Sequence, residues 1–320
     1  MGLFCAMRVV FLFLSLCLLQ GYSFAAKRDT TGFYDIQIAE KRISPELMHF
    51  IRGEGDSLRT ATAWKVYRLL DTLLNTPSSY YYPFDSFRNK SVSIQDVPDG
   101  KFRLFTYNLI LQNGNHLKFG YLQVRDGKEN TVYPLLDTLF RSNKDLADKE
   151  LETTEWMGAL YYAVFPFKDK KKKCYLLMGY DGATANSNKK VMDVLWFDKG
   201  NPVFGREIFK EGNYDLNPSC RGIYEFHNQS TMLLRYEADR KIVVLDKLGP
   251  AFPEAVNDFY YYIPSGDLDY YKWTKQGFWV RDALDNYDFG QGAKPKGPQS
   301  SPKPNDPGQP DAPELDKPKE

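Results

Sequence analysis

The sequence has few cysteines and histidines and almost no net charge. Its four cysteines and three histidines do not stand at the spacing of a zinc knuckle or a helical metal motif. Lysine plus arginine (42) nearly balances aspartate plus glutamate (41), which argues against a surface built for nucleic acid. Glycine-rich phosphate loops and Gly-x-Ser-x-Gly nucleophile motifs are also missing. We therefore predict no metal site, no cofactor, no identifiable catalytic residue and no nucleic-acid partner.

Long apolar runs are missing except near the N-terminus. One run follows Arg8 and covers residues 9–19, whereas a membrane-spanning helix needs roughly 20 apolar residues. Ser23 and Ala25 then place small residues at the two positions that signal peptidase reads. We expect residues 1–25 to be a cleaved signal peptide, which leaves no transmembrane span in the mature chain. The alternative is an uncleaved membrane anchor.

Removal of this leader would leave two cysteines, Cys174 and Cys220. An exported chain with two cysteines can form one disulfide, so these residues are a candidate pair. The alternative is two reduced thiols.

The C-terminal segment is poor in aromatic residues and rich in proline. Residues 290–320 contain no aromatic side chain, and proline, glycine, lysine and aspartate dominate them. Such a segment cannot bury enough apolar surface to offset the entropy lost on ordering. We expect a disordered tail over 290–320, preceded by a helical segment over 26–90 and a β-rich domain over 91–289.

Helical periodicity is strongest just after Gly55-Asp56-Ser57-Leu58. Apolar side chains at positions 66, 69, 70, 73 and 74 form one stripe, and Asp56 or Ser57 can cap the helix. The tetrapeptide also spells the signature of GDSL esterases, but residues 50–54 are not an apolar strand and no histidine follows an aspartate by three residues. The capping interpretation explains Asp56 and Ser57 without any catalytic role. A second, weaker helix is predicted over Leu135–Leu151.

Alternation of apolar and polar residues predicts strands in the rest of the chain. Two hairpins are expected, Phe102–Leu111 with His116–Val124, and Leu160–Phe167 with Cys174–Tyr180. The segments 105–127 and 161–182 both read strand, turn, strand and Asp-Gly, which suggests a faint repeat. Further strands are predicted at Val191–Phe197, Ile223–His227, Met232–Tyr236, Ile242–Leu245, Phe259–Ile263, Tyr270–Trp273 and Phe278–Val280.

The fold class that follows is α+β. It is predominantly antiparallel β, built from repeated hairpins, with an N-terminal helix. A propeller-like arrangement and a sandwich both fit the repeated hairpins.

Two surface features are candidates for binding. The lysine run at 170–173 lies between two predicted strands, which indicates a solvated turn or, alternatively, a contact with an anionic envelope partner. Aromatic residues are dense, and most are expected in the core or on an amphipathic surface. Four of them are candidates for stacking on a ligand: Trp196, Tyr261, Tyr271 and Trp279.

The stretch from Trp156 to Phe204 carries a recognisable pattern. It includes Trp156-Met157-Gly158-Ala159-Leu160-Tyr161-Tyr162, Tyr175-Leu176-Leu177-Met178-Gly179-Tyr180-Asp181-Gly182 and Asn201-Pro202-Val203-Phe204-Gly205. It resembles exported proteins of the Bacteroidota type, over roughly residues 90–285. The resemblance implies a location in the cell envelope, either in the periplasm or at the outer membrane and outside the cell. It implies no activity and no site residues.

The leading hypothesis is therefore a non-enzymatic binding or assembly protein of the envelope, with an envelope protein or glycan as its partner. The alternative is a hydrolase acting on envelope polymers, either glycan or peptide. A hollow that holds two carboxylates at a suitable separation would favour the hydrolase.

Overall fold

The computed structural model describes residues 30–88, 92–127, 129–137 and 142–287. The predicted signal peptide (1–25) and the predicted tail (290–320) lie outside the described residues. The described residues up to Leu284 belong to one compact unit, and a second unit starts at Asp285. The description below concerns the first unit, and η5 (Leu284–Asn286) marks the boundary between the two.

Two long helices precede the strands. They are α2 (Phe33–Arg52) and α3 (Asp56–Leu74), which pack against each other. The shorter helical segments are η1 (Pro77–Tyr81), α4 (Asp85–Arg88), α5 (Asn143–Ala147), η2 (Thr153–Glu155), η3 (Pro253–Ala255) and η4 (Phe259–Tyr261).

The strands form three sheets. Sheet A has the order β1-β2-β3-β4, sheet B has the order β10-β7-β6-β5 with β8 paired to β7, and sheet C has the order β11-β12-β13-β14-β9. The pairings are antiparallel except for β9 with β14. The strands of sheet A are β1 (Ser93–Asp96), β2 (Phe102–Ile110), β3 (His116–Asp126) and β4 (Glu129–Leu136). Those of sheet B are β5 (Leu160–Asp169), β6 (Lys172–Asp181), β7 (Ser187–Asp198), β8 (Asn201–Phe204) and β10 (Gly222–His227). Those of sheet C are β9 (Phe209–Lys210), β11 (Leu234–Glu237), β12 (Ile242–Pro250), β13 (Tyr262–Trp273) and β14 (Trp279–Ala283).

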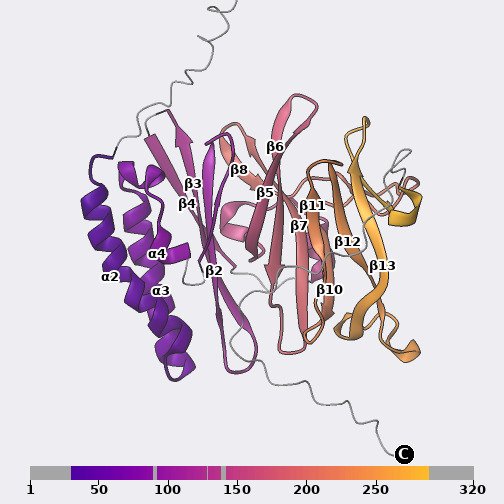
Figure 1. The fold of residues 1–320 in the computed structure, drawn as a ribbon, viewed down its shortest axis with the longest axis horizontal. Helices are drawn as coiled ribbons and strands as arrows, with labels where there is room; N and C mark the ends of the chain where they lie inside the picture. Colours follow the sequence, from indigo (N-terminus) through magenta and orange to yellow (C-terminus); the bar gives the residue numbers. More distant parts are fainter. Residues whose placement is uncertain (1–29, 89–91, 128, 138–141, 288–320) are drawn as a thin grey trace, which may run out of the picture. The chain divides into compact units, whose positions relative to one another are not determined.

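Three apolar clusters show how these elements are layered. The first lies between helices α2 and α3 and one face of sheet A, the second between sheets A and B, and the third between sheets B and C. Figure 1 shows the same succession, from the two indigo helices across sheets A and B to the orange strands of sheet C. Period-two alternation divides β2 between two clusters, since Phe105 and Tyr107 face the helices while Phe102 and Leu104 face sheet B.

Strand β6 lies in the middle sheet and is buried on both faces. Residues Cys174, Leu176 and Met178 enter the third cluster, while Tyr175 and Leu177 enter the second. A strand covered on both sides has no need for alternation between apolar and polar residues, and it carries a continuous apolar run instead.

A buried ion pair joins strand β7 of sheet B to Arg221, the residue just before β10. The guanidinium of Arg221 and the carboxylate of Asp193 are both inaccessible to solvent and lie 3.1 Å apart. Arg221 also donates hydrogen bonds to the carbonyl oxygens of Leu146, Lys149 and Phe204. Asp193 accepts one from the Tyr161 hydroxyl at 2.9 Å. Every nitrogen of the guanidinium and both oxygens of the carboxylate therefore have a hydrogen-bond partner, which offsets the cost of burying the two groups.

The α+β class with mainly antiparallel strands and an N-terminal helix is confirmed. Both predicted hairpins are present, as β2–β3 and β5–β6, and both units of the faint repeat correspond to them. The predicted helix that starts at Asp56 is confirmed as α3, although Gly55 is its N-cap and no side chain caps it. The carboxylate of Asp56 instead accepts a hydrogen bond from the backbone N–H of Gln112 at 2.9 Å.

Helix α2 lies within the segment 26–90 that was predicted to be helical, but its own bounds were not predicted. Its interior Pro45 is unusual in a helix because proline removes a hydrogen-bond donor. Two local predictions were wrong. The helix predicted over Leu135–Leu151 is reduced to α5, because β4 continues through Leu136, which pairs with Phe119 of β3. The strand predicted at Phe259–Ile263 begins as the helical turn η4. Strand β13 then continues without a break through the next predicted strand, Tyr270–Trp273.

Candidate functional site

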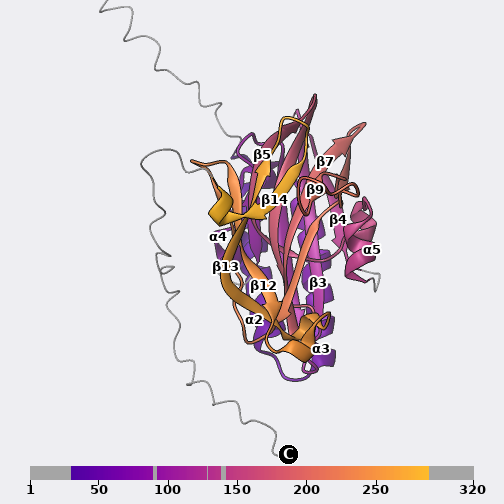
Figure 2. The same ribbon diagram turned by 90° about the vertical axis from the view of Figure 1, so that its right-hand side faces the viewer.

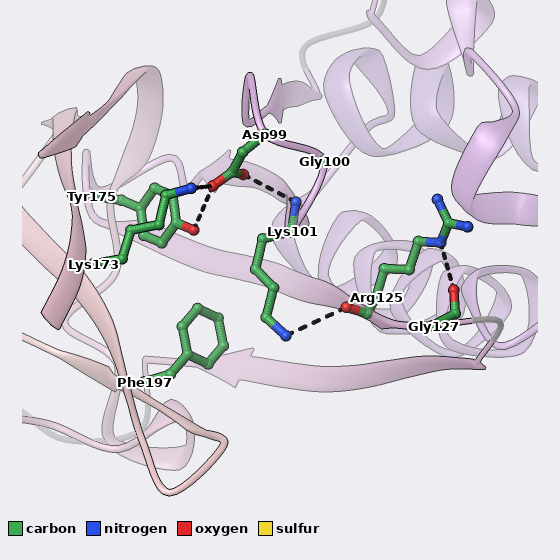
Figure 3. A pocket seen from close by; sticks show the side chains of 8 residues that line it. All are labelled: Asp99, Gly100, Lys101, Arg125, Gly127, Lys173, Tyr175 and Phe197. Atoms are coloured by element: carbon green, nitrogen blue, oxygen red, sulfur yellow. Dashed lines mark hydrogen bonds and ion pairs between the residues drawn. The ribbon is translucent and has the colours of Figure 1, made fainter. Parts of the chain in front are cut away.

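A solvent-open hollow of about 460 Å³ lies where turns of sheet A meet strands of sheet B. Three basic side chains and one acidic side chain line it, together with a phenol, a phenyl ring and two glycines (Figure 3). The lining residues are Asp99, Gly100, Lys101, Arg125, Gly127, Lys173, Tyr175 and Phe197. We call this hollow the cationic pocket.

The turn between β1 and β2 supplies the acid and the central lysine. Its shape requires Gly100, which has φ of +65°, a conformation that costs glycine little. The backbone N–H of Lys101 donates to the Asp99 carboxylate at 3.1 Å, which closes an Asx turn. The Tyr80 hydroxyl fixes the turn from behind by donating to the Gly100 carbonyl at 2.8 Å. The sequence therefore holds both charged side chains on a preformed loop.

The Lys101 ammonium extends across the pocket (Figure 3). It lies 3.5 Å from the carbonyl oxygen of Arg125 and 5.6 Å from the centre of the Phe197 ring. The Arg125 guanidinium stacks over the Tyr81 ring at 4.7 Å and donates to the Gly127 carbonyl at 2.9 Å. Neither cation is paired with a carboxylate in these contacts. The Lys101 ammonium lies inside the pocket, whereas the Arg125 guanidinium points away from Lys101 and Lys173 (Figure 3).

Lys173 and Tyr175 come from the start of β6 and converge on Asp99. The Lys173 ammonium forms an ion pair with the Asp99 carboxylate, and the Tyr175 hydroxyl donates to the same carboxylate at 2.8 Å. Burial acts to raise the pKa of Asp99, but these hydrogen bonds and the Lys173 charge hold that pKa below its ordinary value. Burial and the bond to Asp99 raise the pKa of Tyr175 far above its ordinary value.

These groups suit binding better than proton transfer. The lowered pKa of Asp99 keeps it ionised at neutral pH, and the raised pKa of Tyr175 keeps it a neutral phenol. The eight lining residues include no histidine, and a general acid or base works best when its pKa is near the working pH. With three cations against one anion, the pocket offers its excess positive charge to an anionic ligand.

A second hollow of about 450 Å³ is richer in carboxylates. Glu150, Asp169 and Glu207 line it beside Arg206. Asp169 is neutralised by Arg206, whose Nε lies 2.8 Å from the carboxylate. Burial raises the pKa of Glu150, which Arg206 opposes and Glu207 reinforces. This hollow contains the type of carboxylate group that the hydrolase hypothesis requires.

A charged cluster also links sheet A with sheet B. The Lys118 ammonium lies 2.8 Å from Asp181 and 3.2 Å from Asp137. Burial disfavours the charge on Lys118, but the two carboxylates outweigh this and raise its pKa. The neighbouring His116 is hydrogen-bonded to Asn108 at 2.6 Å, and its burial lowers its pKa despite the charge of Asp181. We interpret this cluster as a tie between the two sheets.

The four aromatic residues predicted to stack on a ligand do not form one surface. Trp196, Tyr271 and Trp279 are buried together in the cluster between sheets B and C. A ring buried in this way has no face available to a ligand in solvent. Only Tyr261 is exposed, on the turn η4. For Trp196, Tyr271 and Trp279, the aromatic side chain reflects packing in the core rather than a binding surface.

The two cysteines are free and buried. Cys174 enters the cluster between sheets B and C, and Cys220 precedes the buried Arg221. No disulfide joins them in the structure. Burial raises the pKa of both thiols, to about 12 for Cys220, so neither is a reactive thiolate at neutral pH.

Most residues of the cationic pocket were not candidates from the sequence. Asp99 and Lys101 stand in the turn between β1 and β2, whereas Arg125 stands near the end of β3, and nothing in the chain order shows that they meet. The one available signal was the lysine run at 170–173, whose last member, Lys173, lines the pocket. Only Lys170 and Lys171 form the predicted turn, because β6 already begins at Lys172.

The sequence matches no protein family model, and no curated protein or solved structure is detectably similar to the chain. Within the described ranges, no helix is both long and apolar enough to cross a membrane. The same residues contain no group of three or more histidine, cysteine, aspartate or glutamate side chains placed to hold a metal ion.

Proposed function

We propose that this chain is an exported, non-enzymatic binding protein of the cell envelope, and that its cationic pocket takes an anionic group of an envelope glycan. The observation that carries the proposal is that three basic residues, Lys101, Arg125 and Lys173, line one hollow together with a single carboxylate. A carboxylate or a phosphate on a sugar matches this charge.

The walls of the pocket support binding of a sugar rather than a bare ion. Phe197 offers a partly exposed ring beside the Lys101 ammonium, so a ligand with an apolar face and a charged group meets both. Export rests on the leader-like residues 1–25, which combine Arg8, an apolar run and small residues before position 26.

Isothermal titration of the full chain with sodium glucuronate, against glucose as the neutral analogue, tests this proposal. We expect glucuronate to bind and glucose not to bind. Lys101→Gln should weaken glucuronate binding about tenfold, since a hydrogen bond to a charged group contributes about 1.5 kcal/mol or more. Lys65→Gln is the matched control, because Lys65 is an exposed lysine paired with Glu46 on the helices.

Equal binding of the two sugars, or equal loss in the Lys101 and Lys65 variants, would contradict the proposal. Raising the salt concentration should weaken glucuronate binding, because the pocket is open to solvent and its charges are screened. Binding that is insensitive to salt would also count against it.

The second hollow is the observation that favours the alternative, a hydrolase of envelope polymers. Its Glu150 has a raised pKa and could serve as a general acid beside Glu207. Release of reducing sugar from purified envelope glycan, abolished by Glu150→Gln and unaffected by Lys101→Gln, would replace the binding proposal with this one.

A further inference from the structure

An exposed apolar surface lies at the turn that joins β12 to β13 in sheet C, coloured orange in Figures 1 and 2. We call residues 251–263 the aromatic segment. Six large apolar side chains in it are 36–58% exposed: Phe252, Val256, Phe259, Tyr260, Tyr261 and Ile263. Single exposed apolar residues are ordinary, but several gathered on one turn mark an interaction surface.

The aromatic segment is held in a defined shape. Its two ends are joined by a hydrogen bond from the backbone N–H of Ala251 to the Tyr261 carbonyl at 2.9 Å. The Asp258 carboxylate accepts from the backbone N–H of Tyr260 at 3.3 Å. The rings of Phe252 and Tyr261 lie 5.2 Å apart, and His227 of β10 stacks on Tyr261 at 6.4 Å. A partner therefore meets an ordered surface, which lowers the entropy cost of binding.

The charge of the aromatic segment selects the kind of partner. Residues 251–263 contain the acids Glu254 and Asp258 and no lysine or arginine. Glu254 and Asp258 are both exposed among the aromatic side chains. A surface with this charge repels anionic bilayers and acidic glycans, and it attracts cations.

Aromatic rings beside carboxylates form a suitable surface for lysine and arginine side chains. A cation gains energy over a ring face within about 6 Å, and a carboxylate adds an ion pair. The chain itself shows this geometry elsewhere, with the Lys172 ammonium 4.0 Å from the centre of the Trp196 ring. We propose that the aromatic segment docks an extended, lysine- or arginine-bearing segment of a partner protein. This site is independent of the cationic pocket.

Fluorescence anisotropy of a labelled (Gly-Arg)6 peptide, titrated with the full chain at low salt, tests the proposal. We expect saturable binding that Tyr260→Ala weakens about two- to fivefold, the range that exposed cation–π contacts give. Glu254→Gln should weaken binding and reduce its dependence on salt. Tyr34→Ala should have no effect, because Tyr34 is 74% exposed on α2 and is the matched control.

Three results would overturn the proposal. The first is the absence of saturable binding of (Gly-Arg)6, and the second is equal weakening by the Tyr260 and Tyr34 variants. The third is competition by cellohexaose that depends on Tyr260, which would make the aromatic segment a glycan surface instead. Lys101→Gln separates this site from the pocket, since it should leave peptide binding unchanged while it weakens glucuronate binding.

Discussion

Replacement of Arg221 by methionine should destabilise the whole compact unit. The substitution keeps the apolar stem but removes the guanidinium, which leaves the carboxylate of Asp193 fully buried without its partner cation. Three backbone carbonyls also lose their donor. Breaking a buried pair from one side costs about 3–5 kcal/mol, a large share of the roughly 5–15 kcal/mol that stabilises a typical domain.

Urea unfolding followed by tryptophan fluorescence measures this loss directly. The same experiment on Arg235→Met supplies the control, because Arg235 forms an ion pair of similar length, 2.7 Å, with Glu237 but is 55% exposed. Exposed pairs contribute about 0–1 kcal/mol, so the two variants should differ by several kcal/mol. Adding Asp193→Asn to Arg221→Met should recover part of the loss, since it removes the orphaned charge.

A loss below about 1 kcal/mol for Arg221→Met would refute this reasoning. It would mean that water or a rearranged neighbour reaches Asp193 once the guanidinium is gone. A double variant less stable than Arg221→Met alone would likewise show that the cost does not come from an unpaired charge.

Three further predictions follow from other buried groups. The pKa of His116 is lower in the folded chain than the unfolded value of about 6.5, so its contribution to stability is present above pH 6.5 and is lost as pH falls below it. The free energy of unfolding, measured in urea at pH 7 and pH 5, should therefore differ less between the two pH values in His116→Gln than in the unchanged chain. Cys174 and Cys220 should react with a thiol reagent only after unfolding, and prompt labelling of the native chain would contradict their burial. Gly158→Ala should lower the free energy of unfolding by about 1–3 kcal/mol, because Gly158 has φ of +74° and an added Cβ would lie 2.4 Å from the Cδ atom of Lys118. An unchanged midpoint of thermal or urea unfolding would refute this prediction.

Local patterns in the sequence were sufficient to predict most strands, because apolar and polar residues alternate along a half-buried strand. The β2–β3 and β5–β6 hairpins follow from such alternation and from polar turns. The bounds of helix α2 were not predicted, because its buried stripe includes Glu40, which accepts a hydrogen bond from Tyr82, and because the exposed Pro45 lies inside the helix. Tyr82 is 42 residues from Glu40 in the sequence, so no local window shows this partner.

The candidate site was far less predictable than the fold. The cationic pocket gathers residues from two turns of sheet A and two strands of sheet B, separated by up to about a hundred positions. Each of these residues, such as Lys101 or Arg125, is an ordinary surface charge in sequence. The candidate aromatics failed for the opposite reason, since Trp196 and Trp279 serve a third layer whose existence the hairpins alone did not reveal.

The position of Lys173 and Tyr175 at the start of β6 determines how a bound ligand would affect the stability of the fold. The same strand continues between two apolar clusters through the middle of the stacked sheets, so this wall of the pocket cannot shift without disturbing both. This wall of the pocket is therefore fixed in place. Occupancy of the pocket should therefore raise the melting temperature of the entire compact unit in a single transition, rather than tightening only the turns that touch the ligand.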